Sequence, residues 1–264
     1  MTDCPEPDFH VISLRFLLQS NERVTYVNPP PLEFETENIR FRLADGKLTC
    51  EMKTHFSTEK EARLVVDPIL KAWEADAELP WNRAGELQFK FEGAEIIDRS
   101  PAPRGVVRGH AHITLPPLRV NGVGMVSAHA QRDRYPEPPI DFRLNADVES
   151  MVHRYMNYLR GREPLPAMAY FCLTVLEAKS GNRKGRRGHV AKTYQVEEAI
   201  LEKMGELTSN CGDLLTARKA PARRPLSGSE GAWLEAAVKT LICRLGDTRK
   251  TGLPLITMSD LPSL

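Results

Sequence analysis

Apolar and polar residues follow different periods in two parts of the chain. Up to about residue 132, apolar positions mostly alternate with polar ones, as in half-buried strands, and beyond residue 145 they recur at helical spacing. Between these parts, residues 134–140 hold prolines that fix φ and remove amide donors, as suits a connector. The pattern predicts an α+β fold, with an N-terminal antiparallel β-sheet domain that has one or two helices, followed by a C-terminal all-helical bundle. We assign residues 1–133 to the sheet domain, 134–144 to the connector, 145–250 to the helical domain and 251–264 to an irregular tail on the surface.

One β-hairpin is predicted in detail in the first part. Asp45-Gly46 is a type I′ turn signal, because both central residues of that turn need positive φ. Counting outward from the turn puts apolar residues on one face, in the pairs Leu43 with Leu48, Phe41 with Cys50, and Ile39 with Met52. The same alternation predicts strands at residues 10–19 and 87–97, and Asn121-Gly122 predicts a further hairpin within residues 105–130.

Two helices are predicted between these strands. Thr58 and Glu61 have the spacing of a capping box, which opens the first helix. Asp67 and Pro68 are typical of an N-cap and first helical position, so a second helix is expected to run to about Leu79. The apolar face of the first helix is expected to consist of Ala62, Leu64 and Val65, and Trp73 lies on the second helix.

The second part predicts four or five helices. Residues 145–160 form an amphipathic pattern, and Gly161 is expected to end that helix. Residues 165–178 are apolar on all sides, so this helix is expected at the centre of the bundle. Ser227 and Glu230 predict a second capping box, and the helix that follows is expected to end at Gly246. The apolar stripes of the first and last of these helices are Val148, Val152, Tyr155 and Leu159, and Leu234, Val238, Leu241 and Leu245.

Composition excludes several classes of protein. Hydrophobic residues make up 41% of the chain and charged residues 27%, which is ordinary for a soluble globular protein. No apolar run approaches the roughly 20 residues of a membrane helix, and the acidic N-terminus does not read as a secretory signal. The five cysteines are widely spaced without a CxxC pair, which argues against a zinc finger or a disulfide framework. We therefore expect reduced thiols, a cytoplasmic location and no membrane partner.

Motifs of the common cofactor-dependent and hydrolytic enzymes are absent from the sequence. It contains no GxGxxG, P-loop, GxSxG or HExxH pattern. We therefore expect no cofactor and assign no catalytic residue, and we favour a binding protein over an enzyme. Whether the chain forms a homo-oligomer stays open at this point.

Charge is divided between the two parts, although the whole chain carries only +1. Residues 1–145 have 18 basic and 22 acidic side chains (−4), and residues 146–264 have 18 and 13 (+5). The strongest concentration is residues 179–192, a glycine-containing segment without an acidic residue, which we interpret as a loop between helices. Its cations are Lys179, Arg183, Lys184, Arg186, Arg187 and Lys192.

A second basic cluster follows in a proline-containing loop. Clustered Lys and Arg side chains bind a phosphate backbone by releasing its condensed counterions, so we expect RNA, DNA or another polyanion as the partner of both loops. Neither segment contains an aromatic residue on which single-stranded bases would stack. An alternative is a structural or interaction protein, in which these arginines pair with carboxylates within the chain. The candidate nucleic-acid-binding residues are Arg183, Lys184, Arg186, Arg187, Lys192, Arg218, Lys219, Arg223 and Arg224.

Residues 190–204 resemble the helix-turn-helix motif. Ala191 supplies the small residue of its first helix, and Gln195 stands where the motif commonly has glycine. The resemblance implies that the second helix reads the major groove, but that helix carries many glutamates, which repel phosphates. We therefore interpret these residues as a packed helix pair and expect any nucleic-acid contact to come from the loops.

Arg183 and His189 stand six residues apart, a spacing that resembles the arginine–histidine pair of HEPN-type ribonucleases. The resemblance implies an all-helical domain that cleaves RNA, in which the histidine handles protons and the arginine neutralises phosphate. Lys184 departs from the family, which usually has a polar residue directly after the arginine.

Three histidines fall on one face of the predicted hairpin within residues 105–130. His110 and His112 are two residues apart on one strand, and His129 lies opposite Thr114 on the same face. The HxH spacing resembles that of cupin barrels, which would imply a transition-metal site. No carboxylate follows where that family has one, so we interpret these histidines as surface or packed residues and expect no metal.

Overall fold

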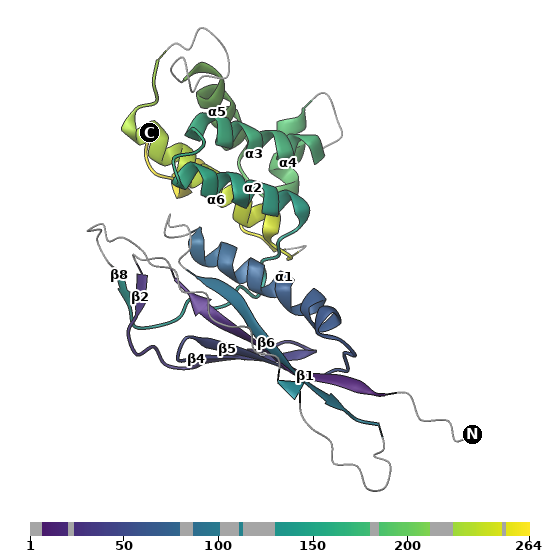
Figure 1. The fold of residues 1–264 in the computed structure, drawn as a ribbon. Helices are drawn as coiled ribbons and strands as arrows, with labels where there is room; N and C mark the ends of the chain where they lie inside the picture. Colours follow the sequence, from purple (N-terminus) through teal and green to yellow (C-terminus); the bar gives the residue numbers. More distant parts are fainter. Residues whose placement is uncertain are drawn as a thin grey trace, which may run out of the picture. The chain divides into compact units, whose positions relative to one another are not determined.

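The chain folds into an antiparallel sheet followed by a group of helices, in agreement with the predicted α+β class (Figure 1). A computed structural model of the protein describes residues 7–20, 24–79, 87–100, 111–112, 130–179, 185–211, 224–249 and 252–264. The chain divides into a sheet unit, Met1–Glu78 with Gly85–Pro138, and a helical unit, Leu79–Ala84 with Pro139–Leu264. The change from one unit to the other, at Pro138, falls within the stretch predicted as a connector.

Within the described residues the sheet has six strands in the order β3-β4-β5-β1-β6-β7, and all its neighbours are antiparallel. A separate pair of short strands, β2 and β8, is parallel. The two longest strands, β1 and β6, pair along most of their length and correspond to the two long strands predicted from the sequence. The strand bounds are β1 Phe9–Gln19, β2 Val24–Tyr26, β3 Leu32–Glu35, β4 Ile39–Ala44, β5 Lys47–Met52, β6 Gln88–Asp98, β7 Ala111–His112 and β8 Ala130–Arg132.

The predicted hairpin is confirmed in both turn and register. Asp45 and Gly46 have φ of 50° and 70°, as a type I′ turn requires. Leu43 pairs with Leu48, Phe41 with Cys50, and Ile39 with Met52. All six of these residues are buried, because they form the face of the sheet that packs against the rest of the core.

One continuous helix, α1 (Glu59–Glu78), replaces the two helices predicted here and lies along one face of the sheet (Figure 1). Pro68 is inside this helix rather than at the start of a new one. The predicted apolar face is confirmed for Ala62, which is fully buried, but it was wrong for the other two residues, because Leu64 is 69% exposed and Val65 36% exposed. The face that packs on the sheet consists instead of Ala62, Val66, Leu70, Trp73 and Ala77.

Trp73 and the residues after β8 complete the core of the sheet unit. The indole of Trp73 is fully buried and donates its Nε1–H to the carbonyl of Pro136 at 2.9 Å. Tyr135 is also buried, and its hydroxyl accepts the amide of Gly46 at 3.1 Å. Residues 135–136, which lie in the stretch predicted as a connector, are therefore packed into this core.

The helical unit has five helices and a short 3₁₀ turn among its described residues, in agreement with the predicted bundle. The apolar helix α3 contacts each of the other four helices, so its predicted central position is confirmed. The bounds are α2 Ala146–Leu159, α3 Leu165–Lys179, α4 Arg186–Tyr194, α5 Glu198–Asn210, α6 Gly228–Gly246 and η1 Met258–Asp260.

Two helices in this unit begin at a side-chain cap, and the second of these caps was expected from the sequence. The side chain of Asn145 accepts the amides of Asp147 and Val148 at the start of α2. Ser227 and Glu230 form the predicted capping box of α6, with each side chain bonded to the backbone amide of the other.

The predicted loop at residues 179–192 was wrong in its second half, where α4 begins at Arg186. Gly185 has a left-handed φ of 70°, which glycine adopts without strain, and this conformation turns the chain into α4. This glycine therefore marks the start of a helix and not the middle of a loop. The hairpin predicted within residues 105–130 lies outside the described residues apart from β7 and the first residue of β8. No helix in the described ranges combines the length and apolarity needed to cross a membrane.

Candidate nucleic-acid interface

The described candidate residues lie in two places in the helical unit. Arg186, Arg187 and Lys192 are on α4, and Arg224 immediately precedes the turn into α6. The remaining candidates, Arg183, Lys184, Arg218, Lys219 and Arg223, lie outside the described residues.

Helix α4 is short, and its packing explains where it begins and ends. It buries Val190 and Ala191 on one side and contacts α3 and α5. It ends at Gln195, which has a left-handed φ of 50° and whose amide bonds to the carbonyl of Ala191. Gln195 thus takes the backbone conformation that glycine commonly supplies at a helix-turn-helix turn, and α4 and α5 form the helix pair expected there.

The opposite side of α4 forms an exposed basic face. Arg186, His189, Lys192 and Thr193 are exposed, and we call these four residues the α4 face. Residues three or four apart are neighbours on a helix, so the basic side chains of this face follow one another along the surface. The α4 face therefore presents cationic and hydrogen-bonding groups in a single row.

Arg187 points the other way and is held inside the helical unit. Its Nε donates to Oε1 of Glu177 on α3 at 3.0 Å, and its side chain is 37% exposed. Its guanidinium also lies over Gly205 of α5, where an added Cβ would come within 2.3 Å of Nη2. The guanidinium of Arg187 therefore lies in a small site, here called its seat, between the carboxylate of Glu177 and the backbone of Gly205. The space is open because Gly205 has no side chain.

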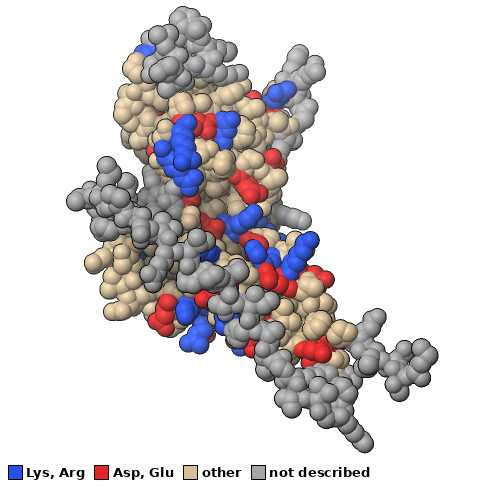
Figure 2. All heavy atoms as spheres, in the orientation of Figure 1, with Lys and Arg blue, Asp and Glu red and all other residues tan. Residues whose placement is uncertain are grey.

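A hollow of about 410 Å³ opens beside this seat, at the start of α4. It is lined by two arginines, two glutamates and a glycine, namely Glu177, Gly185, Arg186, Arg187 and Glu198. The carboxylate of Glu198 lies close to Gly188, where an added Cβ would be 3.3 Å from its oxygens. Basic and acidic groups thus meet in one place, and Figure 2 likewise shows basic side chains directly beside acidic ones over the helical unit.

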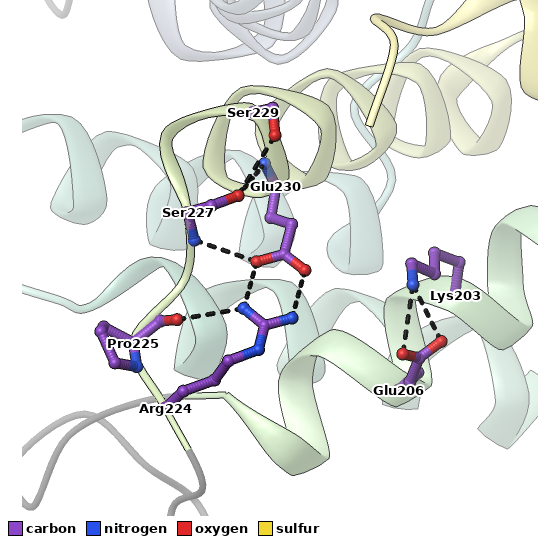
Figure 3. A network of polar contacts seen from close by, with 7 residues as sticks. All are labelled: Lys203, Glu206, Arg224, Pro225, Ser227, Ser229 and Glu230. Carbon is purple, nitrogen blue, oxygen red and sulfur yellow. Dashed lines mark hydrogen bonds and ion pairs between the residues drawn. The ribbon is translucent and has the colours of Figure 1, made fainter.

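Arg224 is engaged by the acidic residue of the α6 capping box (Figure 3). Its two terminal nitrogens face both oxygens of Glu230, at 2.5 and 2.6 Å. This bidentate contact and the amide of Ser227 lower the pKa of Glu230 to about 2, and the same hydrogen bond raises the pKa of Arg224. A backbone bridge between Cys211 and Arg224 fixes where the chain enters this contact.

The acidic character predicted for the second helix of the pair is present on α5. Glu202 and Glu206 are exposed, and Lys203 is paired with Glu206 at 3.0 Å. Glu197, just before α5, accepts the amide of Met258 from the C-terminal tail. This helix therefore has no net positive face for a major groove.

The two histidine-based predictions are described only in part. His189 is exposed on α4, whereas Arg183 lies outside the described residues, so the HEPN-like arrangement stays a prediction. A direct check is RNA cleavage by the protein and its loss in His189→Ala. His112 is placed on β7, whereas His110 and His129 lie outside the described ranges, within which no group of three or more metal-binding side chains is assembled.

The buried cysteines are not arranged for thiol chemistry. Cys50, Cys172 and Cys211 are buried, and burial raises the pKa of each, that of Cys172 to about 12. Nucleophilic thiols need a lowered pKa, so these side chains act as small apolar residues, as expected from the sequence.

Glu177, Glu198 and Gly205 contribute to the site but were not identified from the sequence. Glu177 is on α3, and Glu198 and Gly205 are on α5, whereas the arginines beside them are on α4. No local sequence spacing therefore links them. Only the Ser227–Glu230 pair carried a local signal, and it pointed to a helix cap rather than to a partner for Arg224.

Comparisons with protein-family models, curated proteins and solved structures found no match to this chain.

Proposed function

We propose that this protein binds nucleic acid through its helical unit, with the α4 face contacting the phosphate backbone. The observation that carries the proposal is the placement of Arg186, His189 and Lys192 in one row on the exposed side of a short helix. The cations of this row are Arg186 and Lys192, and such cations neutralise phosphates and release their counterions. Arg183, Lys184, Arg218, Lys219 and Arg223, with Arg187 and Arg224, extend this interface in the proposal.

The acidic neighbours determine what kind of contact is proposed. Glu202 and Glu206 on α5 would repel phosphates if that helix entered a groove, so base edges are not read there. Contacts to phosphate carry no sequence information directly. The proposed binding is therefore largely independent of base sequence and strongly dependent on salt.

The test is binding of labelled RNA and duplex DNA at about 50 to 200 mM salt, measured by fluorescence anisotropy. The double variant R186A/K192A should bind about tenfold more weakly to duplex DNA at the lowest salt. Its plot of log affinity against log salt should be shallower by about 2, since each lost phosphate contact removes about 0.9 from the slope.

A matched control removes two exposed lysines of the sheet unit, in K47A/K60A, with the same loss of charge. Its salt slope should stay at the wild-type value. Equal slopes for the wild type and R186A/K192A would contradict the proposal, as would the absence of binding at 50 mM salt by the wild type and all the interface variants.

The internal ion pairs favour a second candidate, a structural or interaction protein whose arginines stabilise the helical unit. Arg187 contacts Glu177 on the preceding helix α3, and Arg224 contacts Glu230 in the first turn of α6. On this reading R187A and R224A lower the melting temperature, and neither the wild type nor any interface variant binds nucleic acid. Thermal unfolding together with the anisotropy measurement separates the two candidates.

A further inference from the structure

We infer that Glu177 and Glu230 compete with phosphate for Arg187 and Arg224 and so restrict this interface to ligands that offer several phosphates at once. The inference rests on the proposed function and names the regulation and the ligand class of the same site. Both arginines were identified from the sequence as phosphate contacts, and in the free protein both are bound to a carboxylate. A phosphate therefore has to compete with an internal anion at each of them.

The geometry of each pair is the one that a phosphate would use. Arg224 presents two nitrogens to the two oxygens of Glu230, and a guanidinium binds phosphate in the same bidentate manner. Arg187 makes one bond to Glu177 through Nε, which leaves its terminal nitrogens over Gly205. The contact of Arg187 is thus the weaker of the two and the first to exchange.

Exposure makes this exchange feasible. The side chains of Arg187 and Arg224 are 37% and 53% exposed, and Arg187 lines the hollow at the start of α4, so solvent reaches part of each side chain. Their carboxylate partners are less exposed, Glu177 at 23% and Glu230 at 12%. The pairs still open to solvent on the arginine side, where salt screens them. One phosphate gains little by replacing one carboxylate, whereas a chain of phosphates that also contacts the α4 face gains at each position.

The hollow at the start of α4 places the exchange at Arg187 beside the α4 face. Arg186, which belongs to that face, and Arg187 both line it, and so does Glu177. A phosphate backbone that follows Arg186 therefore arrives next to the Arg187–Glu177 pair.

The main test removes each competing charge with little change in shape. E177Q and E230Q should bind a 20-nucleotide RNA about three- to fivefold more tightly than the wild type at 50 mM salt. Glutamine at position 230 keeps an oxygen that accepts the amide of Ser227, so the capping box is retained. Melting temperatures close to that of the wild type would show that each variant is folded.

A second variant releases Arg187 without changing the charge of the protein. In Gly205→Ala the new methyl group would come within 2.3 Å of Nη2, so the guanidinium has to leave its seat. G205A should therefore raise the affinity in the same direction as E177Q. The matched control is E149Q, an equal change of charge at an exposed position of α2, which should leave the affinity within about twofold of the wild type.

Inorganic phosphate and a nucleoside monophosphate serve as single-phosphate probes. At about 1 mM, neither should displace the RNA from the wild-type protein, because each offers only one phosphate. Tighter binding by E177Q, E230Q and G205A but not by E149Q supports the inference. Wild-type binding that none of these variants strengthens beyond E149Q overturns the inference and leaves the proposed function standing. Absence of binding by the wild type and by E177Q/E230Q overturns both.

Discussion

At the scale of single residues, His10 on β1 is an ionisable side chain buried without a full set of partners. It is 4% exposed and stacks on His55 with ring centroids 5.2 Å apart, and its Nδ1 has no hydrogen-bond partner in the part of the chain that the structure describes. Burial lowers the pKa of His10, and the positive charge of Arg99 and the ring of His55 lower it further, against the opposing effect of Asp8. The folded protein therefore binds a proton at His10 less readily than the unfolded chain does.

This difference predicts a loss of stability on acidification. Below the ordinary histidine pKa of 6.5 the unfolded chain takes up a proton that folded His10 resists, so the free energy of unfolding should fall as the pH drops from 7.5 through 6.5 to 5.5. Urea unfolding at these three pH values measures the effect. His10→Phe keeps a ring against His55 without the titration and should show a flatter dependence.

An exposed histidine of α2 provides the control for this measurement. His153→Gln should retain the pH dependence of the wild type, because His153 is exposed. If His10→Phe has the same pH dependence as the wild type, His10 is not its origin.

At the scale of elements, α1 shows how packing overrides a local stop signal. A proline inside a helix lacks the amide that would bond to the preceding turn, and it costs about 3 kcal/mol relative to alanine. Here the chain continues as a helix because Val66 and Leu70 on either side of Pro68, followed by Trp73, are all buried against the sheet. The apolar face of one long helix therefore outweighs the missing hydrogen bond.

This arrangement predicts that Pro68→Ala stabilises the protein. Pro68 is exposed, so the substitution loses little packing while it restores an amide donor to the middle of α1. The free energy of unfolding should rise by about 1–3 kcal/mol, measured by urea unfolding. A decrease would mean that Pro68 contributes something other than an interruption of the helix.

At the scale of the molecule, a segment without regular secondary structure packs against each unit from a later part of the chain. In the sheet unit this role falls to Tyr135 and Pro136, which bond to the hairpin turn and to Trp73. In the helical unit the C-terminal tail lies along the turn between α4 and α5, where Ile256 forms a parallel bridge with Val196. The amide of Ile256 donates to the carbonyl of Gln195, and its carbonyl accepts the amide of Glu197, at 2.9 and 2.8 Å.

The tail is therefore expected to stabilise the α4–α5 turn and, through it, the α4 face. Truncation after residue 250 removes both backbone bonds and should lower the free energy of unfolding by about 1–3 kcal/mol. Ile256→Pro removes one of them and should have a smaller effect in the same direction. Deleting only residues 262–264, which follow the last buried residue Leu261, should change stability little.

The α+β order, the hairpin register and the capping box of α6 were predictable because each depends on residues close in sequence. A type I′ turn needs only Asp45-Gly46, and a capping box needs only Ser227 and Glu230. The concentration of positive charge in the second part was equally visible, since it is a property of composition. The periodic spacing of apolar residues was sufficient to predict most of the helices of the bundle.

The partners of the basic residues depend on the folded chain. Sequence spacing could not show that Glu177 and Gly205, from helices on either side of α4 in the chain, would form a seat for Arg187 while Arg186 remains exposed. Nor could it show that Pro68 would lie inside a helix. In each case the outcome rests on side-chain contacts between different secondary-structure elements, whose energies local patterns do not contain.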